Sequence, residues 1–212
     1  MLDPGWFRIP AFTGTAIVAF AQSFALYPLF LFIAIYFQDL LGFSPLATGV
    51  RLLPLTLALF VVAPVSGALT ARVELRFLLA LGLSLIGVGL LLMRQIETAS
   101  SWTALLPGFL VGGAGIGVIS PALAAAMVGV LSDDETGLAS GVNNTFRQLG
   151  IAVGIAALGA IFEHRIGPLG QHRHLDPTAF SEALSRIFLV AAVVAFAAVP
   201  LSLGLIRQRD FS

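Results

Sequence analysis

Six long apolar stretches alternate with short polar segments along the 212 residues of the chain. Each stretch is close to or longer than the ~20 apolar residues that an α-helix needs to cross the hydrocarbon core of a bilayer. None shows the two-residue alternation of a membrane β-strand. The pattern predicts an all-α integral membrane protein, a single six-helix transmembrane bundle over residues 1–212, with spans at about 12–37, 47–71, 77–93, 102–131, 137–162 and 183–206.

The six predicted spans differ in the polar side chains that they contain. Ser84 is the only polar residue of the third span, and Ser202 is the only one in the apolar run 187–206 of the sixth. The other four spans contain amides, tyrosines, an arginine, or several prolines and glycines. Such groups are tolerated in a membrane where neighbouring helices or cavity water satisfy them. We therefore expect the third and sixth spans to face lipid and the other four to face the protein interior.

The composition excludes a water-soluble fold. Hydrophobic residues make up 58% of the chain and charged residues only 10%, with a mean hydropathy of +0.99, whereas soluble domains carry about 25% charged residues. The net charge is zero, so no nucleic-acid partner is expected. The absence of cysteine excludes disulfides and thiolate metal sites. The first apolar run is too long for a signal peptide and is expected to remain as a span.

The fifth span carries a polar stripe within SDDETGLASGVNNTFRQLGIAVGIAALGAIF, residues 132–162. Ser132 and Glu135 form a capping-box pattern, which predicts the start of a helix. At about 100° per residue, the polar side chains that follow fall within an arc of about 140°; they are Ser140, Asn143, Asn144, Arg147 and Gln148. The opposite side is apolar and contains Leu138, Val142, Phe146 and Leu149.

Arg147 lies about 15 Å along the predicted helix from Gly137, near the centre of a bilayer. An arginine at that depth costs about 2.5–3.5 kcal/mol on insertion scales, so we expect its side chain to face the protein interior. All eleven Asp and Glu residues lie outside the predicted spans or at their ends. The counter-charge must then come from water, a bound substrate or a group outside this chain. In the alternative interpretation, the polar stripe only joins helices through interhelical hydrogen bonds.

Small residues and prolines recur inside the polar spans. Three small-xxx-small pairs predict the close approach of helices, at Gly108/Gly112, Gly113/Gly117 and Gly150/Gly154. Three prolines are candidate points of flexibility, at Pro28, Pro54 and Pro121. The run GGAGIG lacks the G-x-G-x-x-G spacing of a dinucleotide fingerprint and lies inside a span rather than after a strand. No cofactor is therefore expected.

A weak internal repeat relates the two halves of the chain. The segments SPLATG (44–49) and SDDETG (132–137) share Ser, Thr and Gly at the same spacing, and each opens a span. As the second and fifth of six spans, they begin on opposite sides of the membrane. This arrangement predicts two three-helix units of inverted topology, a common plan of secondary transporters.

The segment GLASGVNNTFRQLGIAVGIAALG resembles the penultimate helix of the fourteen-helix drug:proton antiporter branch of the major facilitator superfamily. That branch has the run G-x-x-S-G-x-x-N-T-x-R-Q-x-G-x-x-x-G there, matched here by Gly137, Ser140, Gly141, Asn144, Thr145, Arg147, Gln148, Gly150 and Gly154. The segments FRIPAF, LGFSPLATGVRLLP and PGFLVGGAGIGVISPAL are similar to the same branch. The resemblance covers nearly the whole chain and implies the C-terminal six-helix half of such a transporter.

The resemblance implies a multi-pass protein of the inner (plasma) membrane that exports drugs or other small amphipathic compounds in exchange for protons. Transport would follow alternating access, with this half rocking against a missing N-terminal half. In this family the proton-binding carboxylates usually lie in that N-terminal half. The expected partners are therefore the lipid bilayer, the N-terminal half, a small-molecule substrate and protons. Both termini would be cytoplasmic, although the nearly even distribution of arginines does not itself determine the orientation.

By the same resemblance, the first, second, fourth and fifth helices line a central cavity. The side chains expected to line it are Gln22, Tyr27, Asn143, Asn144, Arg147 and Gln148. Arg147 would be the counterpart of an acid or of an anionic substrate. The loop GALTARVELR matches the family's gating loop at Gly67, Leu69, Arg72 and Arg76. It has Ala71 where an Asp is usual and Glu74 where a Gly is usual, so we expect a weakened gate.

Two other interpretations of the chain are open. It is an inactive truncated fragment, or it is a homodimer that has two copies of Arg147, no acid and hence no proton coupling. An intramembrane serine protease is disfavoured, because a nucleophile such as Ser140 needs a positioned base and all three histidines are expected in the loop before the last span. A metal site at His172, His174 and Asp176 lacks a fourth ligand. Neither enzymatic activity nor a metal is expected.

Overall fold

The computed structural model describes residues 4–96, 101–130, 136–166 and 176–206. Within these ranges the chain forms long α-helices and no strand, which confirms the predicted all-α membrane bundle. The helices are α1 (Pro10–Ile35), α2 (Pro45–Leu69), α3 (Leu75–Met93), α4 (Leu106–Val130), α5 (Thr136–Ile166) and α6 (Pro177–Leu205). Shorter segments are the 3-10 turns η1 (Pro4–Arg8) and η3 (Trp102–Leu105) and the π-helical turn η2 (Tyr36–Leu40).

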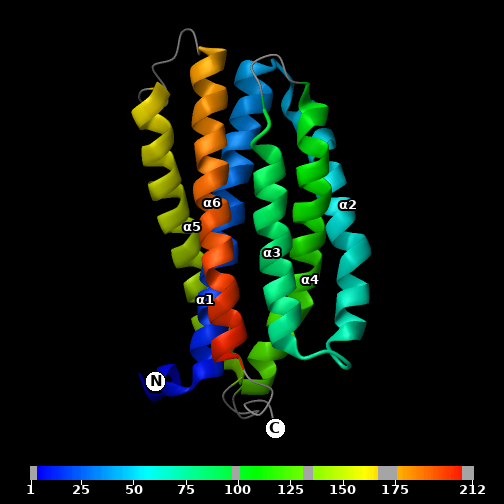
Figure 1. Ribbon diagram of the computed structural model, residues 1–212, viewed down its shortest axis with the longest axis vertical. Coiled ribbons are helices and arrows are strands. Elements are labelled where there is room, and N and C mark those ends of the chain that lie inside the picture. Colours follow the sequence, from blue (N-terminus) through cyan, green and yellow to red (C-terminus); the bar gives the residue numbers. More distant parts are fainter. Residues whose placement is uncertain (1–3, 97–100, 131–135, 167–175, 207–212) are drawn as a thin grey trace.

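All six helices are long and apolar enough to cross a membrane. A helix of 25 residues such as α2 is about 37 Å long, which exceeds the ~30 Å of the hydrocarbon core. Figure 1 shows the helices side by side along the long axis of the molecule, with η1 and the C-terminal end of α6 at the same end. An even number of crossings returns the chain to the side where it started. The chain is a multi-pass membrane protein.

The start of α6 differs from the predicted span because a local cap determines it. The Asp176 carboxylate accepts a hydrogen bond from the backbone N–H of Thr178 at 3.0 Å. Pro177 occupies the first helical position, where proline is favoured because no hydrogen bond from its nitrogen is needed. These residues are polar or turn-forming, so the apolar pattern begins several residues later than the helix. The capping pattern at Ser132 and Glu135 lies outside the described residues.

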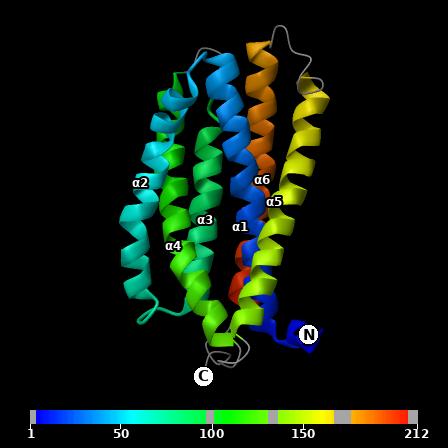
Figure 2. The same ribbon diagram turned by 180° about the vertical axis from the view of Figure 1, so that it is seen from behind.

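The helices pack as two related groups of three. α2 packs on α4 as α5 packs on α1, α3 packs on α4 as α6 packs on α1, and α3 packs on α6. Exchanging α1 with α4, α2 with α5 and α3 with α6 leaves these principal pairs unchanged, as expected for two units of inverted topology. α2 and α5 lie at the two flanks of the bundle (Figure 2) and are its most exposed helices.

The third and sixth helices, which we expected to face lipid, each have a buried and an exposed apolar face. In α3, Leu79, Leu83 and Ile86 are fully buried, whereas Phe77 and Leu81 are exposed. α6 is divided in the same way between the core and the outside. These helices therefore supply much of the core while they keep an apolar surface that suits lipid.

Glycines on α4 let α2 approach closely. Gly113 and Gly117 face the backbone carbonyls of Leu55 and Leu59, respectively. A Cβ atom at Gly117 would lie 2.9 Å from the Leu59 oxygen, and one at Gly113 would overlap the Leu55 oxygen. Small residues at such positions are the usual basis of tight helix packing in membranes. The predicted pair Gly113/Gly117 thus lies at a helix–helix contact.

Candidate functional site

A cavity of about 310 Å³ lies between α1, α2, α4 and α5. Its lining residues are Gln22, Tyr27, Leu59, Ile116, Ser120, Leu123, Ala124, Asn143 and Arg147. Cavities that bind small molecules measure about 300–1,000 Å³. The cavity is therefore large enough for a small organic molecule, and it lies between the four helices that the family resemblance implied.

The two walls of the cavity differ in polarity. α1 and α5 supply the polar wall, with Gln22, Tyr27, Asn143 and Arg147. α2 and α4 supply a mainly apolar wall, with Leu59, Ile116, Leu123 and Ala124. Ser120 belongs to this second wall, but its hydroxyl donates a hydrogen bond to the Ile116 carbonyl of its own helix at 2.8 Å. The cavity as a whole is amphipathic.

A hydrogen bond between Arg147 and Tyr27 joins the two helices of the polar wall. Nη2 of Arg147 donates to the Tyr27 hydroxyl at 3.0 Å. The sequence suggested both residues for the cavity but did not indicate that they contact each other. A neutral phenol orients a guanidinium without removing its charge. Arg147 thus keeps a full positive charge at the cavity.

The glycines of α5 make this contact possible. Gly150 and Gly154 face the backbone of α1, where a Cβ at Gly154 would lie 2.8 Å from the Phe24 oxygen and 2.8 Å from Cγ of Pro28. A Cβ at Gly150 would overlap the Phe20 oxygen. Because Arg147 lies one turn before Gly150, the close approach of the backbones brings its side chain within reach of α1.

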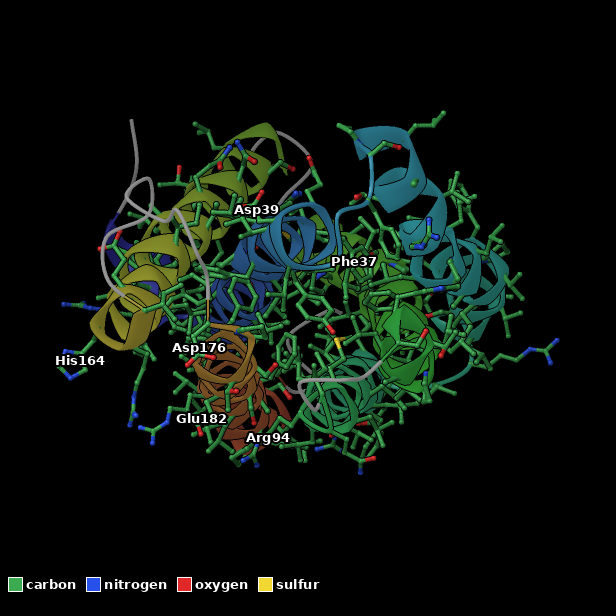
Figure 3. All side chains as sticks on the ribbon, turned by 90° about the horizontal axis from the view of Figure 1, so that it is seen from above. Phe37, Asp39, Arg94, His164, Asp176 and Glu182 are labelled. Carbon is green, nitrogen blue, oxygen red and sulfur yellow. The ribbon has the colours of Figure 1, made fainter. Side chains whose placement is uncertain are left out.

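No carboxylate neutralises Arg147 within the described residues. In these ranges the ion pair found is between Arg76 and Glu74 at the start of α3, and neither residue lines the cavity. Figure 3 looks down on the end of the bundle opposite η1, and Asp39, Asp176 and Glu182 lie there at the ends of α1 and α6. Arg147 lies nineteen residues, or about 28 Å, from the end of α5 at that end of the bundle, so these acids cannot pair with it.

Asn143 is the second polar group that α5 turns toward the cavity. It lies one helical turn before Arg147, and its Oδ1 atom is buried without a hydrogen-bond partner among the described residues. An unsatisfied buried amide oxygen costs on the order of 1–3 kcal/mol. A bound molecule or water that donated to Oδ1 would remove this cost.

The other two predicted cavity residues lie elsewhere on α5. Asn144 and Gln148 are exposed and do not line the cavity. On the apolar side of the helix, Val142 is buried with Trp6 and Phe12, as expected for a core face. Leu138 and Leu149 are exposed, at 45% and 48%. α5 therefore presents a mixed surface outward in addition to the polar groups in the cavity.

The apolar wall was not predicted from the sequence. Its apolar residues lie in apolar spans; they are Leu59, Ile116, Leu123 and Ala124. The sequence alone does not distinguish a leucine that lines a cavity from one that faces lipid. Ser120, next to Pro121, was the one polar residue in this wall and a signal that sequence reasoning did not use.

The predicted gating loop follows α2 at the end of the bundle. Arg72 is exposed, and a Cβ at Gly67 would lie 3.9 Å from Cβ of Pro121 in α4. Nε of Arg76 lies 2.5 Å from Oε2 of Glu74, although the geometry is not that of a hydrogen bond. Both side chains are about one third exposed, so such a pair contributes at most about 1 kcal/mol. Glu74, where the family usually has Gly, is the N-cap of α3 and pairs with Arg76 in the first turn of that helix.

The three predicted flexible points all lie inside continuous helices. α1 continues through Pro28, α2 through Pro54 and α4 through Pro121. Proline removes a backbone hydrogen bond from a helix interior. At each of these positions the helix continues but lacks one backbone hydrogen bond. Their role as flexible points stays a prediction.

One expectation about the histidines is wrong. His164 lies in the last turn of α5 rather than in the following loop. It is about 36 Å along the same helix from Ser140, so it cannot act as a base for that hydroxyl. His172 and His174 lie outside the described residues, and Asp176 caps α6. Within the described ranges no group of three metal-ligating side chains is found.

The comparison with known families agrees with this geometry. Residues 5–155 match the profile described as Major Facilitator Superfamily, which is more than half of the chain. The chain belongs to the major facilitator superfamily. This is a family of membrane transporters rather than enzymes, and the six-helix bundle is the fold of one half of such a transporter.

Relatives within the superfamily bear names that refer to drug resistance. The chain is 35% identical to the Methylenomycin A resistance protein of Streptomyces coelicolor over 73% of its own length and 33% of the relative. It is 33% identical to the Puromycin resistance protein pur8 of Streptomyces alboniger over 76% and 33%, and 31% identical to the Multidrug efflux pump LfrA of Mycolicibacterium smegmatis over 76% and 32%. The chain spans about a third of the length of these curated relatives.

Proposed function

We propose that the chain is the C-terminal half of a proton-coupled secondary transporter that exports drugs or other small amphipathic compounds. The amphipathic cavity carries this proposal, because it pairs an apolar wall with a polar wall and a charged Arg147. The printed names of the relatives, which include a multidrug efflux pump and two resistance proteins, support the same substrate class. The proposed location is the plasma membrane, with both termini cytoplasmic.

In this proposal an N-terminal half covers the cavity on the side flanked by α2 and α5. The exposed polar groups of α5 then contact that half or the water between the halves, which accounts for Asn144 and Gln148 on the outward surface. Rocking of the two halves would open the cavity alternately to each side of the membrane. An acid of the N-terminal half would supply both the proton site and the counter-charge of Arg147.

Efflux measurements on the complete transporter test this function. Cells that express this sequence together with its N-terminal half should export a fluorescent amphipathic dye, and Arg147→Ala should abolish export while the amount of protein in the membrane is unchanged. Arg94→Ala is the matched control, because Arg94 lies at the end of α3 and is exposed. Unchanged efflux in Arg147→Ala would overturn the role of the cavity.

The nucleotide sequence upstream of the codon for Met1 tests the two-half arrangement separately. A continuing or neighbouring reading frame that encodes the remaining spans, with an acid in its first span, is expected. Without such a frame, the homodimer is the alternative. It would place two Arg147 side chains at one cavity, and none of the described lining residues is an acid. Proton coupling would then be the first part of the proposal to be abandoned.

A further inference from the structure

Arg51, near the start of α2, is a second cation in a membrane span, and it lies outside the cavity lining. Its guanidinium carbon lies 3.7 Å from the centroid of the Phe43 ring and 5.5 Å from that of Trp102. Phe43 belongs to the segment before α2, and Trp102 belongs to η3, which leads into α4. The aromatic rings hold the cation between the starts of two spans.

The depth of Arg51 corresponds to the boundary between hydrocarbon and headgroups. Its Cα lies about 9 Å along α2 from Pro45, and the helix is about 7 Å longer than the hydrocarbon core. With this excess shared between the ends, the Cα lies about 5 Å inside the boundary. Nη1 donates to the Ala47 carbonyl, one turn nearer the surface, at 2.9 Å, so the side chain extends toward the headgroups, as arginines near span ends do. Trp102 is a residue type enriched at this level.

The donors of this group are only partly used. Nη1 is bonded to Ala47, whereas Nε is buried without a partner and Nη2 has none among the described residues. Thr48, which lies on the same side of α2, is 4% exposed, and its hydroxyl also has no partner there. No carboxylate within the described ranges forms an ion pair with Arg51. The site therefore has a positive charge and unused donors, and no anion among the described residues balances it.

We propose that Arg51 binds the phosphate of an anionic glycerophospholipid. A phosphate supplies several acceptor oxygens and the missing negative charge, and the depth of the side chain selects a headgroup over a dissolved anion. Leu46 and Val50, at 80% and 55% exposed, offer an adjacent apolar surface to the acyl chains. A headgroup without its own ammonium, such as phosphatidylglycerol, fits best because no second cation competes for the phosphate.

Lipid titration of the purified full chain in neutral detergent tests the site. Phosphatidylglycerol should raise the thermal unfolding midpoint and remain bound in native mass spectra, and Arg51→Met should weaken its apparent affinity roughly 5-fold. Methionine keeps an apolar stem between the two rings, so the variant is expected to fold. Arg51→Lys, which keeps the charge, should retain most of the binding.

Two controls separate this site from general charge effects. Arg94→Met removes a cation at the same end of the bundle, where Arg94 contacts Ser185 at 3.4 Å without an aromatic pair, and it should leave phosphatidylglycerol binding unchanged. Equal binding of phosphatidylcholine, an equal effect of inorganic phosphate, or an equal loss in Arg94→Met would each overturn the proposal. These outcomes do not depend on transport, so they leave the proposed function untouched.

Discussion

α2 and α5 occupy equivalent places in the two three-helix units, yet their exposed faces differ in chemistry. Along α2 the exposed residues are apolar, with Leu57 at 59%, Phe60 at 72% and Val61 at 71%. Along α5 the exposed residues include Asn144, Arg147 and Gln148. An apolar face is stable against hydrocarbon, whereas amides and a guanidinium require water or a polar partner. The exposed polar side chains of these two helices are therefore concentrated on α5.

The two flanking helices, α2 and α5, make similar backbone contacts with their neighbours. In both the α2–α4 and the α5–α1 pair, two glycines one turn apart on one helix face two backbone carbonyls of the other. Gly113 and Gly117 of α4 face α2, and Gly150 and Gly154 of α5 face α1. The two helix pairs thus share the same glycine contacts, whereas the exposed side chains of α2 and α5 differ. This difference in polarity reflects the surroundings of each helix rather than its backbone packing.

The largest effect, a loss of folded protein, is expected from Gly150→Leu. A side chain there meets the Phe20 backbone and Ser23, so α5 must separate from α1. Overpacking costs about 1–3 kcal/mol or more, and we expect loss of folded protein, measured as the monodisperse fraction after detergent extraction. Gly159→Leu is the control, because a Cβ at Gly159 meets nothing within 4 Å. Equal yields for the two variants would contradict the close contact.

A lysine at the same distance from the start of each flanking helix should distinguish the environments of the two exposed faces. Leu57 and Gln148 both lie twelve residues from the start of their helices, or about 18 Å. Leu57→Lys should lower membrane insertion by about 2.5–3.5 kcal/mol, and Gln148→Lys should cost much less. Insertion in the complete transporter is measured by protease protection. Similar losses in both variants would mean that the two faces meet the same environment.

Removal of the Tyr27 hydroxyl should lower efflux less than removal of the Arg147 charge. Tyr27→Phe removes one hydrogen bond, worth about 0.5–1.5 kcal/mol, and leaves the cation in place. We expect reduced but measurable efflux in Tyr27→Phe and none in Arg147→Ala, compared at equal expression. If Tyr27→Phe abolished efflux as well, the hydroxyl would act on the transported species and not only on Arg147.

The smallest effect is expected at the corresponding contact of α2 with α4. Ser66 is buried, and its hydroxyl donates to the Val118 carbonyl of α4 at 2.7 Å. Interhelical bonds of this kind average about 0.6 kcal/mol in a membrane protein. Ser66→Ala should lower the thermal unfolding midpoint slightly and leave efflux unchanged. A loss of efflux would show that this side of the bundle also carries function.

The sequence predicted the features that follow from helical periodicity and membrane depth. Six spans could be counted from hydropathy, and the Arg147 side chain had to avoid lipid because its charge is costly there. The contact of Arg147 with Tyr27 could not be predicted, because it depends on how closely α5 and α1 approach across 120 residues of chain. The start of α6 was placed too late for a local reason, since its first turn is capped by Asp176 and is not apolar.

The limits of the site prediction have a physical origin. Asn144 and Gln148 share the polar arc of Arg147, but they are exposed and do not line this cavity. Leu59 and Leu123 line the cavity without any mark in the sequence. In a bilayer, core, cavity and lipid-facing positions all accept leucine, so apolar lining residues become visible only in three dimensions.

The volume of the cavity also fixes how much solvent accompanies Arg147. At about 30 Å³ per molecule in the liquid, 310 Å³ has room for about ten waters. A guanidinium hydrated in this way would not meet hydrocarbon, although it lies within a membrane span. A molecule that entered the cavity would displace part of this water. Compounds that release it from beside Leu59 and Leu123, while they leave Arg147 and Asn143 wetted or bonded, gain the most from binding.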